Sequence, residues 1–130
     1  MKTGSCLCGA VKYEFDGTSR PVIVCHCNQC RKQTGSMMHA TSVSIDRFRL
    51  TKQRGLKWFR ASKTAARGFC GECGSVLFWK PDSGDRMSFT AGSIDGKTDL
   101  SIEGHIYCDF KADYFTVPQD EGYQKREWDT

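Results

Sequence analysis

The chain has 130 residues, of which 38% are hydrophobic and 26% are charged, and its formal net charge at pH 7 is +4. This length and balance predict one globular domain, residues 1–130, and exclude a disordered chain. No apolar run approaches the roughly 18 residues of a membrane span, so no membrane partner is expected. Lys and Arg are spread along the chain, which favours solvated strand faces over the basic stripe of a nucleic-acid-binding protein.

Short strand-like stretches, separated by turn residues, follow one another along the chain. The expected strands cover residues 11–15, 21–24, 38–45, 48–50, 56–60, 76–79, 86–91 and 104–107, and residues 66–69 lead into the Cys70 motif. Residues 28–34 are predicted to form a short helix that Gly35 ends. Trp58, Trp79 and Phe89 are assigned to the core. This pattern predicts a mainly β domain.

Seven of the eight cysteines fall into three clusters. Cys25, Cys27 and Cys30 form a C-x-C-x-x-C motif, and two flanking pairs are Cys6 with Cys8 and Cys70 with Cys73. Thiolates at these spacings can face one soft cation, and zinc takes them tetrahedrally with Zn–S distances near roughly 2.3 Å. Three such clusters in one short chain predict a zinc protein.

Disulfides are the alternative for an even number of cysteines. They fit poorly, because cysteines two residues apart, such as Cys6 and Cys8, are awkward to bridge with each other. The first residues lead directly into the Cys6 motif and leave no room for a signal peptide. We therefore expect a cytoplasmic protein whose thiols stay reduced and bind metal.

The number of ligands differs between the predicted sites. The outer pairs supply four thiolates, as a closed structural zinc requires, whereas the central cluster supplies three. Three protein ligands with one open position are the pattern of a catalytic zinc. The other grouping, in which the central triad recruits one outer cysteine, would leave a cysteine of an outer pair unused. We prefer one structural and one catalytic zinc per chain.

The assembled motifs resemble those of the glutathione-dependent formaldehyde-activating enzyme family, which also includes centromere protein V. The resemblance runs through GSCLCGAVKYE (residues 4–14), CHCNQCRK (25–32), RGFCGECG (67–74) and GHIY (104–107). It implies a β-tent of curved antiparallel sheets, stapled by zinc knuckles. It also implies a structural zinc on Cys6, Cys8, Cys70 and Cys73 and a catalytic zinc on Cys25, Cys27 and Cys30. The implied reaction makes or breaks a carbon–sulfur bond, as in joining glutathione to formaldehyde.

The chemistry of a three-thiolate zinc agrees with such a carbon–sulfur lyase. Three sulfurs already donate strongly, so the ion activates water poorly but can lower the pKa of a thiol bound at its open position. The expected partners are a small thiol such as glutathione and an aldehyde. Arg31 and Lys32 could offset the added charge or meet a substrate carboxylate, or they form a solvated helical turn. His26 is a candidate general acid or base, or else supports the ligands or is simply exposed.

A second hypothesis is a zinc-stapled module that binds protein or nucleic acid without catalysis. Both zinc sites would then be closed, and the triad would need a fourth protein ligand such as His39, His105 or Cys108. An iron–sulfur protein is a third hypothesis, but the C-x-C-x-x-C spacing does not match the common ferredoxin patterns. An open second site indicates the enzyme, and a closed one indicates the binding module.

Overall fold

The computed structural model describes residues 1–128. These residues form a mainly β fold with open sheets, and this confirms the fold class expected from the sequence. The chain divides into two compact units. The first unit contains Met1–Arg20 and Thr41–Thr98, and the second contains Pro21–Ala40 and the described residues from Asp99 onward. Each unit carries one of the predicted cysteine sites.

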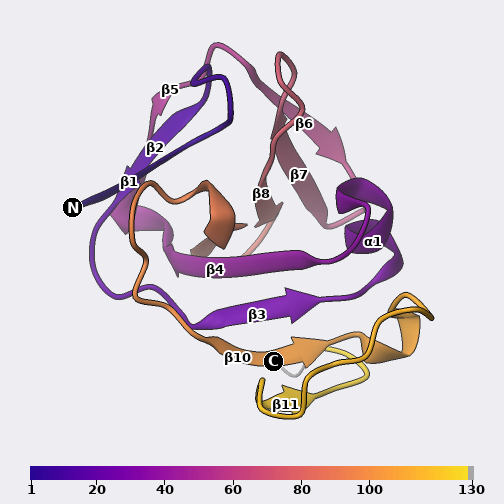
Figure 1. The fold of residues 1–130 in the computed structure, drawn as a ribbon. Helices are drawn as coiled ribbons and strands as arrows, with labels where there is room; N and C mark the ends of the chain where they lie inside the picture. The colour runs from indigo at the N-terminus through magenta and orange to yellow at the C-terminus, as the bar shows by residue number, and fades with distance from the viewer. Residues whose placement is uncertain (129–130) are drawn as a thin grey trace. The chain divides into compact units, whose positions relative to one another are not determined.

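A three-stranded antiparallel sheet opens the first unit (Figure 1), in the spatial order β1 (Lys2–Ser5), β2 (Lys12–Phe15) and β5 (Phe48–Lys52). The strands β2 and β5 were predicted, but β1 was not, since its polar sequence lacks apolar alternation. Gly4 lies directly opposite Tyr13, and a Cβ on Gly4 would lie 2.0 Å from the tyrosine ring. Glycine is therefore required for β1 to pass under that ring.

The remaining strands of the first unit follow one another in space as β6 (Leu56–Arg60), β7 (Ala65–Cys70), β8 (Val76–Pro81), β9 (Arg86–Thr90) and the part of β4 (Met38–Ser44) that follows Ala40. Strands β6 to β9 pair antiparallel. Three aromatic residues were predicted to lie in the core. Phe89 is fully buried, as predicted, and Trp79 is half-buried. The prediction is wrong for Trp58, which is 41% exposed. Trp58 stays accessible because β6 is an edge strand with one neighbour.

An aromatic cluster forms the core of the first unit. Tyr13 lies 5.2 Å from both Phe48 and Phe89, measured between ring centroids, and Phe78 meets it edge-on at 5.5 Å. The Tyr13 hydroxyl forms a hydrogen bond with the Ser93 hydroxyl, at 2.7 Å, in the 3₁₀ turn η2 (Ala91–Ser93). A second 3₁₀ turn, η1 (Ile45–Arg47), connects β4 to β5. The cluster fixes β2, which directly follows the first cysteine pair.

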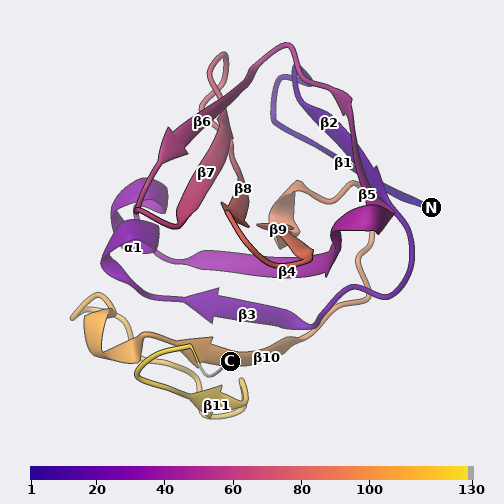
Figure 2. The ribbon, with the colours of Figure 1, turned by 180° about the vertical axis from the view of Figure 1, so that it is seen from behind.

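The second unit, seen best from behind in Figure 2, has the strand order β11 (Tyr123–Gln124), β10 (Ile102–Ile106), β3 (Val22–Cys25) and the start of β4. The pairing of β3 with β4 is antiparallel, as expected. By contrast, β10 pairs parallel with both β3 and β11. A 3₁₀ turn, η3 (Cys108–Phe110), follows β10.

The helix α1 (Asn28–Thr34) lies in the second unit and confirms the predicted boundaries. It ends at Gly35, whose φ of 83° places it in the left-handed region that glycine adopts at helix ends. At its start, the Cys27 thiol caps the helix by accepting a bond from the Cys30 N–H at 3.3 Å. Within residues 1–128, no helix is long and apolar enough to cross a membrane.

Candidate metal centres

The four outer cysteines converge within the first unit. Cys6 and Cys8 follow β1, Cys70 ends β7, and Cys73 closes the knuckle after it. All four sulfurs lie within 4.8 Å of one another, and Cys8 is 3.8 Å from both Cys6 and Cys70, sulfur to sulfur. Four sulfurs at Zn–S distances of about 2.3 Å around one tetrahedral ion are separated by about 3.8 Å. The donor set and its spacing therefore fit zinc, and the separation is far too long for a disulfide.

Neighbouring backbone and hydroxyl groups stabilise negative charge on two of these sulfurs, those of Cys6 and Cys73. The Val11 N–H donates to the Cys6 sulfur at 3.2 Å. Ser75 lies 3.2 Å from the Cys73 sulfur, and its hydroxyl and backbone lower the pKa of that thiol to about 5. Metal ligands must be deprotonated thiolates, so these contacts prepare the cluster for a cation.

Gly55 is part of this site, although no motif identified it. Its N–H donates to Ala10 and its carbonyl accepts from the Gly71 N–H. A Cβ on Gly55 would lie 2.6 Å from the Cys70 sulfur and 2.9 Å from the Ala10 Cβ. The loop before β6 can therefore approach the cluster only without a side chain.

The central triad lies in the second unit, at the junction of β3 and α1. Cys25 ends β3, Cys27 caps α1, and the buried Cys30 lies in its first turn. Their sulfurs all lie within 4.8 Å of one another. Cys27 and Cys30 raise the pKa of the Cys25 thiol, because crowded thiols resist full ionisation unless a cation is present. The donor set fits a soft divalent ion such as zinc.

The proposed fourth ligands from the same chain do not join the triad. Among residues 1–128, no histidine nitrogen, carboxylate oxygen or further thiol completes the group of three sulfurs. Cys108 starts η3, and its N–H donates to the Lys125 carbonyl. His105 uses both ring nitrogens in other hydrogen bonds, and His39 is exposed on β4. The triad thus has three protein ligands in the described chain.

His26 is buried, so the exposed alternative considered for it does not hold. Its Nε2 lies 2.8 Å from Nδ1 of His105, which is equally buried, and Nε2 of His105 lies 3.0 Å from the Glu121 carboxylate. Burial, followed by the nearby His105, lowers the pKa of His26 to about 4. His26 is therefore neutral at pH 7. No local pattern could reveal these hydrogen bonds among His26, His105 and Glu121, because the three residues are far apart in the sequence.

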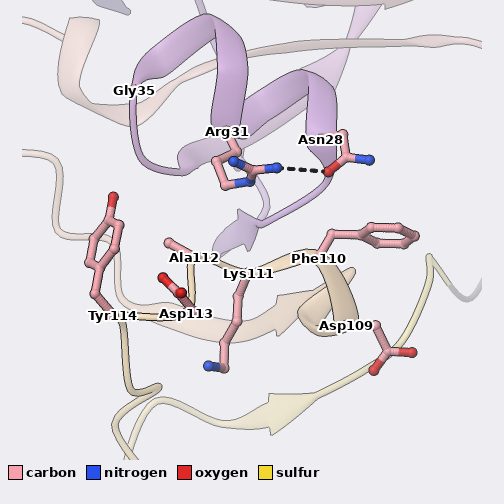
Figure 3. A pocket seen from close by; sticks show the side chains of 9 residues that line it. All are labelled: Asn28, Arg31, Gly35, Asp109, Phe110, Lys111, Ala112, Asp113 and Tyr114. Carbon is pink, nitrogen blue, oxygen red and sulfur yellow. Dashed lines mark hydrogen bonds between the residues drawn. The ribbon is translucent and has the colours of Figure 1, made fainter.

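Arg31 and Asn28 lie beside a pocket of about 530 Å³ in the second unit (Figure 3). The Arg31 Nη2 donates to the Asn28 side-chain oxygen at 3.0 Å. The Nε of Arg31 is buried, and within residues 1–128 it has no hydrogen-bond partner. Lys32, the other cation after the triad, is exposed and does not line the pocket.

The fold and the two thiol clusters define a mainly β protein with two candidate metal centres. The family model of the glutathione-dependent formaldehyde-activating enzyme matches residues 1–110, so the chain belongs to this family. An uncharacterized lyase of Schizosaccharomyces pombe is 25% identical over 113 residues, which span 86% of this chain and 82% of the relative. The family and this relative indicate an enzyme of the lyase kind, and the family name implies glutathione and formaldehyde as substrates.

A solved structure has a similar fold. The crystal structure of a Rhodobacter sphaeroides protein superposes with a TM-score of 0.63 at 22% identity. The match covers 75% of this chain and 91% of the other. At this level of identity the likeness supports the fold and carries no information about substrate.

Proposed function

We propose that the protein is a zinc-dependent carbon–sulfur lyase that joins a small thiol of the glutathione type to an aldehyde and cleaves the adduct. Residues 1–130 act together as one zinc-binding domain. Cys6, Cys8, Cys70 and Cys73 hold a structural zinc, and Cys25, Cys27 and Cys30 hold a catalytic one. The substrates named by the family, glutathione and formaldehyde, are the pair to test first.

The observation that carries this proposal is the unequal number of ligands in the two clusters. The four-thiol cluster supplies a complete tetrahedral set, whereas the triad supplies three sulfurs and has no fourth protein ligand within the described residues. A structural ion favours a closed set, and a catalytic ion needs a position for substrate. The same difference argues against a binding module in which both sites are closed.

A zinc ion on the triad would lower the pKa of an incoming thiol, so that the thiolate is available at neutral pH. In the forward reaction the thiolate sulfur attacks the carbonyl carbon, the carbon–sulfur bond forms, and the carbonyl oxygen takes one proton. The thiol loses one proton, so the addition is balanced and needs no oxidant or reductant. In the reverse reaction the hydroxyl loses its proton, the carbonyl reforms and the thiolate leaves.

His26 is the proposed acid–base group. If both histidines are neutral, Nε2–H of His105 donates to Glu121, and Nδ1 of His105 accepts from Nε2–H of His26. Nδ1 of His26 then carries a lone pair within the ligand-bearing loop, and because the lowered pKa keeps the ring neutral at rest, it takes up a proton only transiently. Arg31 is proposed to act on the substrate through charge, because it directly follows Cys30.

The direct test is the rate at which formaldehyde exchanges between its hydrate and its glutathione adduct, measured by proton NMR exchange spectroscopy. The zinc-loaded protein should accelerate this exchange above the uncatalysed rate. Cys27→Ser should remove the acceleration, and Cys108→Ser, the same change outside both clusters, should keep it. If the zinc-loaded protein fails to accelerate exchange for every thiol and aldehyde tried, the lyase proposal fails and the binding module replaces it.

A further inference from the structure

We propose that the pocket between α1 and residues 109–114 binds the charged ends of the thiol substrate. Arg31 receives a substrate carboxylate, and Asp113 receives its ammonium group. This assignment rests on the proposed function, since it supplies the recognition site for the thiol whose sulfur reacts at the triad. Nine residues line the pocket, all in the second unit: Asn28, Arg31, Gly35, Asp109, Phe110, Lys111, Ala112, Asp113 and Tyr114.

The hydrogen bonding of the Arg31 guanidinium is incomplete. One guanidinium N–H donates to Asn28, while the buried Nε has no partner among residues 1–128. A buried donor without a partner is costly and uncommon in folded proteins. A carboxylate accepts two parallel bonds from Nε and a terminal nitrogen of one guanidinium, which is the geometry that arginine offers and lysine does not. A substrate carboxylate in the pocket would complete this set.

The wall of the pocket that faces Arg31 carries a negative charge. Figure 3 shows Asp113 and Tyr114 on the segment that faces α1, with Arg31 on the helix side. Asp113 is exposed and forms no ion pair within the described residues, whereas Asp109 is engaged by Arg126 at 3.4 Å. The Lys111 ammonium donates to the Phe115 carbonyl at 2.8 Å and points away from Arg31 in Figure 3. The pocket therefore offers one available cation and one available anion.

The pocket and the triad use neighbouring residues at and along α1. Asn28, Arg31 and Gly35 lie at i, i+3 and i+7 and so share one face of α1. Cys27 directly precedes Asn28, and Cys30 directly precedes Arg31. The cysteine ligands are therefore the sequence neighbours of residues that line the pocket. Successive helical residues rise by about 1.5 Å, and an extended tripeptide spans about 10 Å. The assignment requires the sulfur of a peptide thiol to reach the triad while its charged ends lie in the pocket.

This arrangement selects for a class of thiol. A short peptide thiol with carboxylates and an α-ammonium group matches both walls. A neutral thiol such as 2-mercaptoethanol could reach the triad but would leave Arg31 and Asp113 without partners. The pocket thus distinguishes zwitterionic peptide thiols from small uncharged ones through Coulomb attraction and paired hydrogen bonds.

The experiment uses S-methylglutathione, which keeps every charge of glutathione but has no free thiol. Binding to the zinc-loaded protein is measured by titration calorimetry. Wild-type protein should bind S-methylglutathione, and its diethyl ester, which lacks the carboxylates, should bind at least about tenfold more weakly. Arg31→Gln and Asp113→Asn should each weaken binding of S-methylglutathione by about tenfold. Lys32→Gln removes the same charge from the neighbouring exposed position and should leave binding unchanged.

Binding that is equal for the ester, or unaffected by both Arg31→Gln and Asp113→Asn, would overturn the assignment. So would a failure of S-methylglutathione to bind while glutathione still reacts with formaldehyde, a result that leaves the proposed lyase intact. The opposite result, binding that depends on Arg31 and Asp113 without any thiol chemistry, would support the pocket and reject the lyase. Asp113 is exposed, so its variant remains informative if Arg31→Gln does not fold.

Discussion

The Nε2 of His26 and the Nδ1 of His105 lie 2.8 Å apart in the interior of the second unit, although 79 residues separate them in the sequence. Their ring centroids lie 5.0 Å apart, and the ring planes are inclined by 26°. Glu121 extends the contact to a partly exposed carboxylate. Since His26 stands between Cys25 and Cys27, the pair ties the ligand-bearing loop to β10.

Removing His105 should therefore destabilise the protein. His105→Ala leaves the buried His26 nitrogen without its partner, and such a loss costs about 1–3 kcal/mol. Glu121→Gln keeps an oxygen that can accept from His105 and should cost less than about 1 kcal/mol. Both free energies of unfolding come from urea denaturation of zinc-loaded protein. If His105→Ala costs no more than Glu121→Gln, the contact does not stabilise the loop.

The two cysteine clusters should differ in their effect on stability. Cys70→Ser removes a ligand from a site that joins β7 to Cys8, 62 residues earlier. Structural zinc binding contributes about 10–16 kcal/mol in small zinc domains, which exceeds the net stability of most domains, so this variant should unfold or melt far below wild type. Cys27→Ser should melt close to wild type and lose activity. Equal melting temperatures for these variants would contradict the division into structural and catalytic sites.

A methyl group at residue 55 should impair the four-cysteine site without changing any ligand. Gly55→Ala places a Cβ 2.6 Å from the Cys70 sulfur, so the loop or the sulfur must move. Overpacking of this kind costs about 1–3 kcal/mol and should speed the loss of metal to a chelator. Gly92→Ala is the matched control, because a Cβ there meets nothing within 4 Å. Equal rates of zinc transfer to a chromogenic chelator would show that Gly55 plays no part in the site.

Local patterns in the sequence were enough to predict most of the fold. Alternating apolar residues located β2, and the glycine at position 35 marked the end of α1 correctly. The short β11 has only two residues and pairs with residues 19 positions earlier in β10, so no local pattern marks it. The parallel pairing of β10 depends on a long connection from β3, which sequence spacing does not reveal.

The ligand sets could be proposed from spacing, since each motif brings its own sulfurs together. The parts of the site that depend on distant segments could not. Glu121 reaches His105 from the other end of a loop, and Gly55 approaches Cys70 from a strand connection. Trp58 was assigned to the core because large aromatic residues are usually buried, but an edge strand leaves it accessible.

Metal content is the simplest check on the cofactor. The purified protein should contain up to two zinc ions per chain, with little iron, when measured by inductively coupled plasma mass spectrometry. The ratio should fall toward one in Cys27→Ser, because that variant retains the four-cysteine set. Stoichiometric iron together with visible absorption would contradict the zinc assignment.

The central claim is that the triad has an open position for a thiol, and cobalt substitution tests it most directly. Co²⁺ accepts tetrahedral sulfur sites like those of zinc, and its absorption spectrum reports the number of bound sulfurs. Adding glutathione should shift one cobalt from three sulfurs toward four, while the other stays unchanged, and Cys27→Ser should lose this response. Formaldehyde added afterwards should partly reverse the shift, because the adduct sulfur is a weaker ligand. A spectrum that responds to no thiol would mean that the triad is closed, and it would contradict the proposed lyase.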